Sequence, residues 1–481
     1  MVLMGASAHR ESPSNPHLLR DLTPRVRNME PRHGRPERKG RLMTDVWNRI
    51  RGALAGAGDP GADTPDQSLG VAGMLGRVGP ALLASSRAVN EVEVTLRKLA
   101  RRYGRTDLRI FVLPTLILIE DDSSQRGRTA VFAADQGALR LDQAGEVEHI
   151  VRIAMDEATP PDDVVQAVDR IIAGRPRFGA VLTLIGHVLL TIGFGLVLNP
   201  TLTALPVYLV LGVVVGLIVM FGTRASTLAL LLPVLTAFLA ALLISVLVRP
   251  LVHDDVLRLV APSLVTFLPG LTLTIAAVEL TSGQIMAGAS RLVYGIARLG
   301  LLAFGLFAGM SVAGEPHASA SAGDQLGAWA PWAGIALVSL GYYLYSSAPR
   351  GSLLWILYAL VIAYSAQLLG NLLLGAQLSG LVGAVIAVPM IYLAGRLRGA
   401  PSTAIMLTCS YWLLVPGAMG FIGVSEAASG AAGATATILQ TFGSLIAIAV
   451  GMMIGGAVSR DVGAIATGLK KERATTGAGA E

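Results

Sequence analysis

The chain has 481 residues and a mass of 50.0 kDa, with 53% hydrophobic residues, 15% charged residues and a mean hydropathy of +0.61. Soluble domains carry about 25% charged residues, so this composition indicates an α-helical polytopic membrane protein. The single cysteine, Cys409, excludes an internal disulfide and a thiolate zinc site. The seven histidines have no metal-binding spacing. We therefore expect no metal and no cofactor.

The charges are concentrated at the beginning of the chain. Of the 38 Lys and Arg residues 26 precede Phe178, as do 23 of the 32 Asp and Glu residues. The first third therefore has the composition of a soluble protein, and the rest is more apolar than the mean. A pI near 9.6 could suggest nucleic acid, but the basic residues flank apolar segments. Membrane topology explains them better, and we expect no nucleic-acid partner.

Residues 1–80 are expected to form a disordered leader. They are rich in Arg, Pro, Gly and Asp and have no apolar periodicity, so they cannot bury enough surface to offset the entropy of ordering. No apolar core follows the early arginines, which argues against a secretory signal peptide. The protein could start at Met1 or at Met43.

Residues 81–177 are expected to form a small cytoplasmic α+β domain. Apolar residues recur at helical spacing over 82–103, and β-rich runs follow at 108–120, 129–134 and 138–141. Two further helices come next, the second with Thr159 as its N-cap and Gly174 just past its end. The domain has no nucleotide-binding loop, so ATP-driven transport is not supported.

Ten apolar segments follow the domain. A transmembrane helix needs about 20 apolar residues, and each segment approaches that length. The ten expected spans are 178–198, 204–221, 226–248, 256–278, 285–313, 330–346, 352–369, 378–394, 402–424 and 435–458.

Loop charges predict the orientation of these spans. If the N-terminal domain is cytoplasmic, the outward loops contain Arg249 as their only basic residue. An excess of Lys and Arg marks cytoplasmic loops. The protein is therefore expected in a bacterial cell (inner) membrane, with both termini in the cytoplasm. The basic residues of the inward loops and of the cytoplasmic tail 459–481 are Arg224, Arg350, Arg396, Arg398, Arg460, Lys470, Lys471 and Arg473.

The external loop 314–329 divides the spans into two halves of five, 178–313 and 330–458. Because five is odd, the second half would enter the bilayer from the opposite face. The predicted architecture is therefore two inverted five-helix halves, as in many secondary transporters.

The fourth span of each half contains a Pro-Gly pair, Pro269-Gly270 and Pro416-Gly417. Proline removes a backbone donor and glycine tolerates positive φ, so each pair is suited to breaking a helix. Two broken helices would supply half-helix ends that can hold the amino and carboxylate groups of a substrate. The alternative is that both pairs are packing kinks.

The residues around the first Pro-Gly pair resemble the signature of the threonine/serine exporter family. Residues 267–292 contain, in order, Pro-Gly, Glu279, Gly283, Gly288 and Arg291. Gly370-Asn371, the region of Pro401 and residues 414–417 resemble the second module of that family, and residues 82–172 are similar to its cytoplasmic N-terminal region.

The resemblance implies a fused two-module protein that exports L-threonine, L-serine and other small amino acids, driven by the proton motive force. In relatives with separate modules an aspartate is common where Glu279 stands, and a dicarboxylate such as succinate has been proposed as their cargo. A succinate-like substrate is therefore the alternative.

The candidate site residues have three expected roles. The substrate pathway is assigned to the two Pro-Gly pairs together with Arg298, Gln367 and Asn371, although Gln367 and Asn371 could instead make interhelical hydrogen bonds. Glu279 is expected to carry the coupling proton and Arg291 to be its structural partner, the alternative being a carboxylate at the membrane boundary. Gly283 and Gly288 are expected to allow close helix packing.

His187 is the histidine that lies within an expected span, 178–198. It could relay protons, but a neutral histidine bonded to a neighbouring helix is the favoured interpretation.

A second hypothesis makes the soluble domain an enzyme or a membrane-anchored sensor. Within 82–174 the domain has one histidine, His149, and no cysteine. Nucleophilic or metal catalysis is therefore improbable, and we expect no catalytic residues and a non-enzyme. The expected partners are the amino acid substrate, protons and the bilayer, and the sequence does not indicate an oligomeric state.

Overall fold

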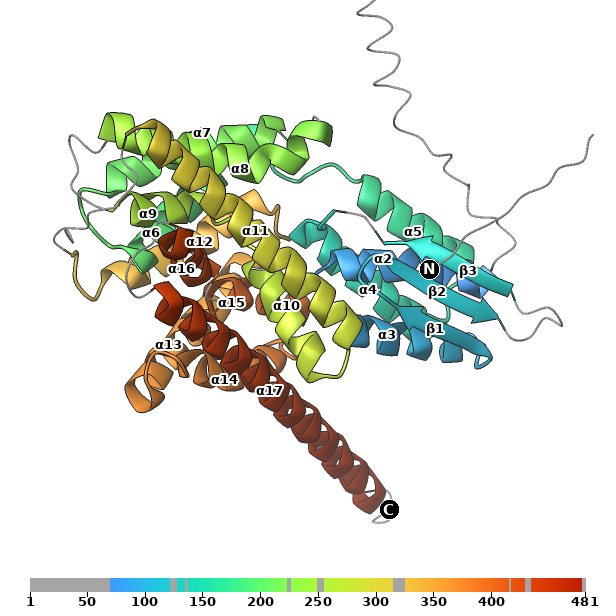
Figure 1. Cartoon of the computed structure of the whole chain (residues 1–481). Helices are drawn as coiled ribbons and strands as arrows, with labels where there is room; N and C mark the ends of the chain where they lie inside the picture. Colours follow the sequence, from blue (N-terminus) through green and yellow to red (C-terminus); the bar gives the residue numbers. More distant parts are fainter. Residues whose placement is uncertain are drawn as a thin grey trace, which may run out of the picture. The chain divides into compact units, whose positions relative to one another are not determined.

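The computed structural model describes residues 70–121, 128–134, 137–222, 226–248, 255–314, 325–414, 417–428 and 434–477. All of these belong to one compact unit. The chain is mostly helical, with a small α/β region before a large set of apolar helices (Figure 1). Most of the expected leader lies outside the described residues.

In its described residues the N-terminal region consists of a three-stranded antiparallel sheet and four helices. The strand order is β1-β2-β3, and β1 pairs with β2 with Ile110 opposite Ile119. Alternate residues of β1 are buried, so one face of the sheet packs against helices. The elements are α2 (Gly70–Ala84), α3 (Val89–Arg102), β1 (Leu108–Val112), β2 (Leu116–Asp121), β3 (Arg128–Ala133), α4 (Leu141–Glu157) and α5 (Pro161–Ala173).

Helix α2 occupies part of the segment that was expected to be a disordered leader. Its glycines explain how it packs on the sheet, and they give it a composition that resembles a linker. A Cβ on Gly76 would clash with the ring of Phe132, and one on Gly79 would clash with Ile117. The absent side chains therefore let the helix lie directly on the sheet, with Met74 fully buried.

Two expected elements of this region are divided. The run 108–120 forms two strands, because the chain turns back where Leu113 donates its N–H to Leu116 O. The helix expected over 82–103 is interrupted between α2 and α3, where Ser86 has a φ of 63°. Residues 138–141 form no strand and lead into α4.

The apolar helices follow the expected spans in order. Among the described residues, six helices are long and apolar enough to cross a membrane, so the chain is a polytopic membrane protein. Helices α12 and α14 are shorter, at 16 residues each. A count of ten spans stays a prediction. The elements are α6 (Ala180–Leu198), α7 (Leu205–Gly222), α8 (Ser226–Leu243), η2 (Ile244–Val248), α9 (Val256–Val260), η3 (Ala261–Leu264), α10 (Gly270–Thr281), α11 (Ile285–Val312), α12 (Ala330–Tyr345), α13 (Leu353–Leu374), α14 (Ser379–Ala394), α15 (Thr403–Leu414), α16 (Gly417–Ala428) and α17 (Ala434–Gly477).

Both Pro-Gly segments separate two helices. In the first, α10 begins at Gly270 and Pro269 is the residue before it, with φ −80° and ψ 30°. In the second, α15 ends at Leu414 and α16 begins at Gly417, whereas Pro416 lies outside the described residues. Helix α10 contacts α15, and α16 contacts α9 and η3.

The first helices of the two predicted halves, α6 and α12, pack closely through glycines. A Cβ on Gly186 would lie 2.9 Å from Gly341 O, and one on Gly193 would lie 2.8 Å from Gly334 O. In both helices the two glycines are seven residues apart. The contact is therefore antiparallel and reciprocal, which agrees with the inverted repeat that the sequence predicts.

Candidate functional site

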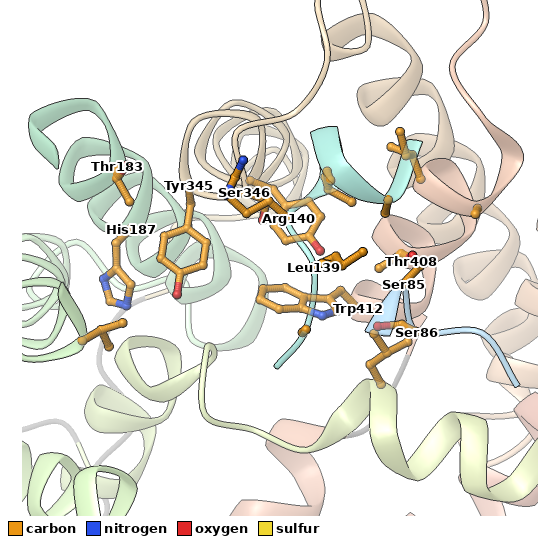
Figure 2. Close-up of a pocket in the computed structure, with 18 of the residues that line it drawn as sticks. Ser85, Ser86, Leu139, Arg140, Thr183, His187, Tyr345, Ser346, Thr408 and Trp412 are labelled. Carbon is orange, nitrogen blue, oxygen red and sulfur yellow. The ribbon is translucent and has the colours of Figure 1, made fainter. Parts of the chain in front are cut away.

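A cavity of about 430 Å³ lies between the N-terminal region and the apolar helices (Figure 2). Its volume falls in the usual range for small-molecule pockets, roughly 300–1,000 Å³. The helices that line it are α6, α7 and α10 from the first predicted half and α12 and α15 from the second. The turn after α2 and residues of the segment 138–144 form the remaining wall.

Hydroxyl, aromatic and basic side chains converge on this cavity. The lining contains no carboxylate, and its basic residues are Arg140 and His187. Figure 2 shows His187 beside Tyr345, and their ring centroids are 5.7 Å apart. The hydroxyl-bearing residues of the lining are Ser85, Ser86, Thr183, Tyr342, Tyr345, Ser346 and Thr408.

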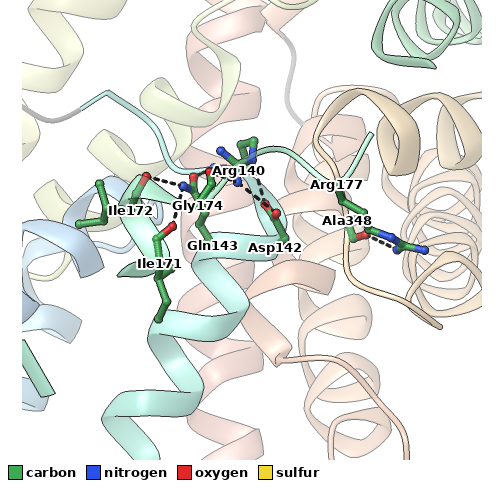
Figure 3. A network of polar contacts seen from close by, with 8 residues as sticks. All are labelled: Arg140, Asp142, Gln143, Ile171, Ile172, Gly174, Arg177 and Ala348. Atoms are coloured by element: carbon green, nitrogen blue, oxygen red, sulfur yellow. Dashed lines mark hydrogen bonds and ion pairs between the residues drawn. The ribbon is translucent and has the colours of Figure 1, made fainter. Parts of the chain in front are cut away.

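Arg140 is held in place by a network at the start of α4 (Figure 3). Its Nε donates to Asp142 at 3.1 Å, and its Nη2 donates to the carbonyl of Gly174 at 3.1 Å. The amide of Gln143 donates to the carbonyls of Ile171 and Ile172, each at 3.0 Å. The first turn of α4 thereby satisfies the carbonyls at the end of α5, and Arg140 is fixed at the cavity wall.

The segment between α5 and α6 is anchored on the end of α12. The Nη1 of Arg177 donates to Ala348 O and to the hydroxyl of Tyr343, both at 2.9 Å. Its guanidinium also lies over the rings of Phe178 and Tyr343. In addition, Leu141 N donates to Ser346 O at 3.1 Å. The N-terminal region is therefore bound to the helix that contributes Tyr345 to the cavity.

His187 is bonded to a neighbouring helix, which is the interpretation that the sequence favours. Its Nδ1 lies 3.0 Å from Gly212 O on α7. A carbonyl only accepts, so Nδ1 carries the proton, and Nε2 is left to accept from the hydroxyl of Thr266 at 3.5 Å. The position of His187 in the cavity lining was not expected.

A second cavity, of about 60 Å³, adjoins the first Pro-Gly break. It is lined by Leu268 and Gly270, and it shares Leu271 and Trp412 with the larger cavity. The Trp412 ring lies 4.7 Å from that of Tyr342, centroid to centroid. Leu271 and Trp412 therefore separate the two cavities, and they belong to the helices α10 and α15 that meet at the breaks.

Glu279 links the helices to the N-terminal region. Its side chain is fully buried, and Oε1 accepts a hydrogen bond of 2.9 Å from the N–H of Val89, the first residue of α3. Arg291 Nε lies 3.1 Å from Oε2. The predicted ion pair is thus present, although the Nε–H is not aligned for a hydrogen bond and both atoms lack a hydrogen-bond partner. Its part in proton coupling stays a prediction.

The two glycines predicted to serve helix packing differ. A Cβ on Gly288 would lie 2.8 Å from Ala276 O, so Gly288 does allow α10 and α11 to approach. Gly283 has nothing within 4 Å of its Cβ position and a φ of 84°. It therefore permits the turn between these helices, because only glycine adopts this conformation without strain, and it makes no close contact.

The remaining predicted residues do not line either cavity. The Nη1 of Arg298 lies 3.5 Å from the hydroxyl of Tyr294 on the same helix, and its Nε is buried without a partner. Gln367 is half-buried and Asn371 is exposed, both on α13. Their roles in substrate passage stay predictions.

Residues 74–313 match a family model, ThrE, which is described as "Putative threonine/serine exporter". No curated protein and no solved structure matches the chain. The matched stretch runs from α2 to the end of α11, so it contains the N-terminal region, the first Pro-Gly break and the Glu279–Arg291 pair. Over these residues the chain belongs to the threonine/serine exporter family.

Proposed function

We propose that this protein exports small amino acids, L-threonine and L-serine, from the cytoplasm of a bacterial cell in exchange for protons. The observation that carries the proposal is the cavity of about 430 Å³, which is lined by helices of both predicted halves. Secondary transporters bind substrate at the interface between their repeats. The N-terminal region forms the cytoplasmic wall of the cavity.

Two helix ends line the cavity, and their opposite partial charges suit a zwitterionic substrate. Helix α12 ends at Tyr345, and α15 begins just before Ala404, and both residues line the cavity. A helix carries partial negative charge at its C-terminus and partial positive charge at its N-terminus. The substrate ammonium group therefore faces the end of α12. Its carboxylate faces the start of α15 and Arg140, and Thr408 is available for the side-chain hydroxyl.

Alternating access requires a barrier that can open. Leu271 and Trp412 are that barrier in our proposal, since they alone line both cavities. Leu271 belongs to α10, which begins at the first Pro-Gly break, and Trp412 belongs to α15, which ends at the second. Rotation of a half-helix would therefore move the barrier without unfolding a complete span. Glu279, paired with Arg291, is the carboxylate that we propose couples this movement to protons.

The test is transport by the full chain in inside-out vesicles. An acidic lumen should drive accumulation of threonine and serine, measured as uptake of labelled substrate, and succinate serves as the comparison. Trp412→Ala should lower this uptake by about tenfold. Trp329→Ala is the matched control, because Trp329 is 59% exposed and lines neither cavity.

Non-saturable flux that ignores the pH gradient would overturn the proposal. Gradient-driven uptake of succinate without uptake of threonine would change the substrate class to dicarboxylates. If the purified chain bound threonine but moved no substrate, the sensor hypothesis would replace transport.

A further inference from the structure

A second glutamate occupies the position in the second half that Glu279 occupies in the first. Glu279 is the tenth residue after Pro269, and Glu426 is the tenth residue after Pro416. Helices α10 and α16 both begin at the glycine of a Pro-Gly pair, and both contain 12 residues. Each glutamate therefore lies in the last turn of an equivalent half-helix.

The packing of the neighbouring helices supports this equivalence. Helix α10 packs on α11, and α16 packs on α17. A Cβ on Gly309 of α11 would lie 3.1 Å from Leu242 N of α8, and one on Gly455 of α17 would lie 3.1 Å from Ala384 O of α14. The helix that follows each half-helix therefore packs through a glycine on the helix that precedes the break region, α8 in the first half and α14 in the second.

The two glutamates lie at opposite ends of the helical region. Glu279 contacts Val89 in the N-terminal region. Helix α16 contacts α9 and η3, which precede the first break, as well as α10, α11 and α17, and its main contacts do not include the N-terminal region. The last turn of α10 therefore meets the N-terminal region, whereas α16, which carries Glu426, lies away from that region (Figure 1).

The two glutamates differ in the side chain that each contacts on the following helix. Oε2 of the half-buried Glu426 accepts a hydrogen bond of 3.2 Å from the hydroxyl of Thr437 on α17. An arginine only donates, so the Arg291 partner suits an ionised carboxylate. A hydroxyl can also accept, so Thr437 can bond Glu426 in either protonation state. The contact with Thr437 can therefore persist whether Glu426 is protonated or ionised.

We propose that Glu426 is the proton-binding carboxylate at the external end of this exporter. The inference rests on the proposed function and extends it. A proton from the outside binds one carboxylate oxygen of Glu426 to give the neutral acid, and the same O–H bond breaks when the proton is released to water toward the cytoplasm. No electron is transferred.

Few charged groups lie on the elements packed against α16. Among the described side chains, α9 carries Arg258, which pairs with the N-cap Asp255 at 4.0 Å. Helix α10 carries Glu279, and α11 carries Arg291, Arg298 and Tyr294 as its titratable residues, while η3 and residues 435–459 of α17 carry none. Among the described side chains of these neighbouring elements, the cations are therefore Arg258, Arg291 and Arg298.

The experiment measures uptake of labelled threonine into inside-out vesicles with and without an acidic lumen. Threonine exchange in the absence of a gradient is measured for each variant as a check that it is folded. Glu426→Gln should reduce the stimulation by the gradient by about tenfold. Glu157→Gln is the control, because Glu157 is exposed at the end of α4. Thr437→Val should move the lumen pH at which uptake is half-maximal.

The outcomes separate this inference from the proposed function. If the unaltered protein shows no gradient-driven uptake, the proposed function fails. If it does, and Glu426→Gln responds to the gradient like the unaltered protein, the assignment of Glu426 is overturned. Should Glu426→Gln not fold, an unchanged pH profile of Thr437→Val overturns it instead.

Discussion

The contacts of Glu279 show how one residue can join two parts of the chain. A buried carboxylate is costly unless it is paired and hydrogen-bonded. Glu279 meets this requirement with the N–H of Val89 from one part and the guanidinium of Arg291 from the other. The first N–H groups of a helix have no intrahelical partner, so the carboxylate also satisfies an orphan donor of α3.

Breaking this pair should destabilise the protein. Glu279→Gln keeps an acceptor for Val89 but leaves Arg291 as an unpaired cation whose side chain is only 17% exposed. We expect a loss of about 3–5 kcal/mol in the free energy of unfolding. The double variant Glu279→Gln/Arg291→Gln should recover part of it, because no unpaired charge remains. Thermal unfolding in detergent measures both. Equal melting temperatures for Glu279→Gln and the unaltered protein would contradict the buried pair.

Among the apolar helices, small residues allow particular pairs of helices to pack closely. Without a hydrophobic drive between helices in lipid, close backbone approach supplies the packing energy. The glycines of α6 and α12 provide it reciprocally, and Gly288 provides it between α10 and α11. Any added side chain at these positions meets backbone atoms, which cannot move as a flexible side chain could.

A pair of glycine substitutions tests this packing. Gly193→Ala places a Cβ 2.8 Å from Gly334 O, so we expect a loss of stability of about 1–3 kcal/mol. Gly300→Ala, in the helix α11, meets nothing within 4 Å and should be neutral or stabilising by up to about 1 kcal/mol. The two melting temperatures are compared in the same detergent. If Gly193→Ala were as stable as Gly300→Ala, the close approach of α6 and α12 would be refuted.

Features that depend on local sequence were predicted more successfully than those that depend on tertiary contacts. The break before Gly270 follows from proline and glycine alone, and the partner of Glu279 follows from the scarcity of charge nearby. Helix α2 was missed because its glycines resemble a linker, although they are there to approach the sheet. Tyr345 and Trp412 were missed because an aromatic residue in a span reads as core until the fold places it beside a cavity.

Across the whole molecule, the N-terminal region and the apolar helices share one cavity. The turn after α2 and the start of α4 form part of its wall. Val89, directly after that turn, donates its N–H to Glu279, and Leu141 at the start of α4 donates its N–H to Ser346 O. The N-terminal region is therefore positioned to control access from its own side. In the proposed function substrate enters the cavity from the cytoplasm, and export would then require this region to move relative to α15.

A reversible crosslink tests that requirement. A Cβ on Gly145 of α4 would lie 3.1 Å from the Cδ1 of Ile405 on α15, which also lines the cavity. Because Cδ1 lies two bonds beyond the Cβ of Ile405, the Cβ atoms of cysteines at these two positions would be more than 4 Å apart, and a small shift of α4 toward α15 would bring them to the separation of about 3.5–4.5 Å that a disulfide needs. The native thiol, the buried Cys409, is replaced by serine in the same protein.

We expect threonine uptake to fall when the pair is oxidised and to return on reduction, whereas each single-cysteine protein should transport equally in both states. Full transport by the oxidised pair would show that the cavity loads without movement of the N-terminal region against α15, and the cytoplasmic gate would then have to lie among the apolar helices themselves.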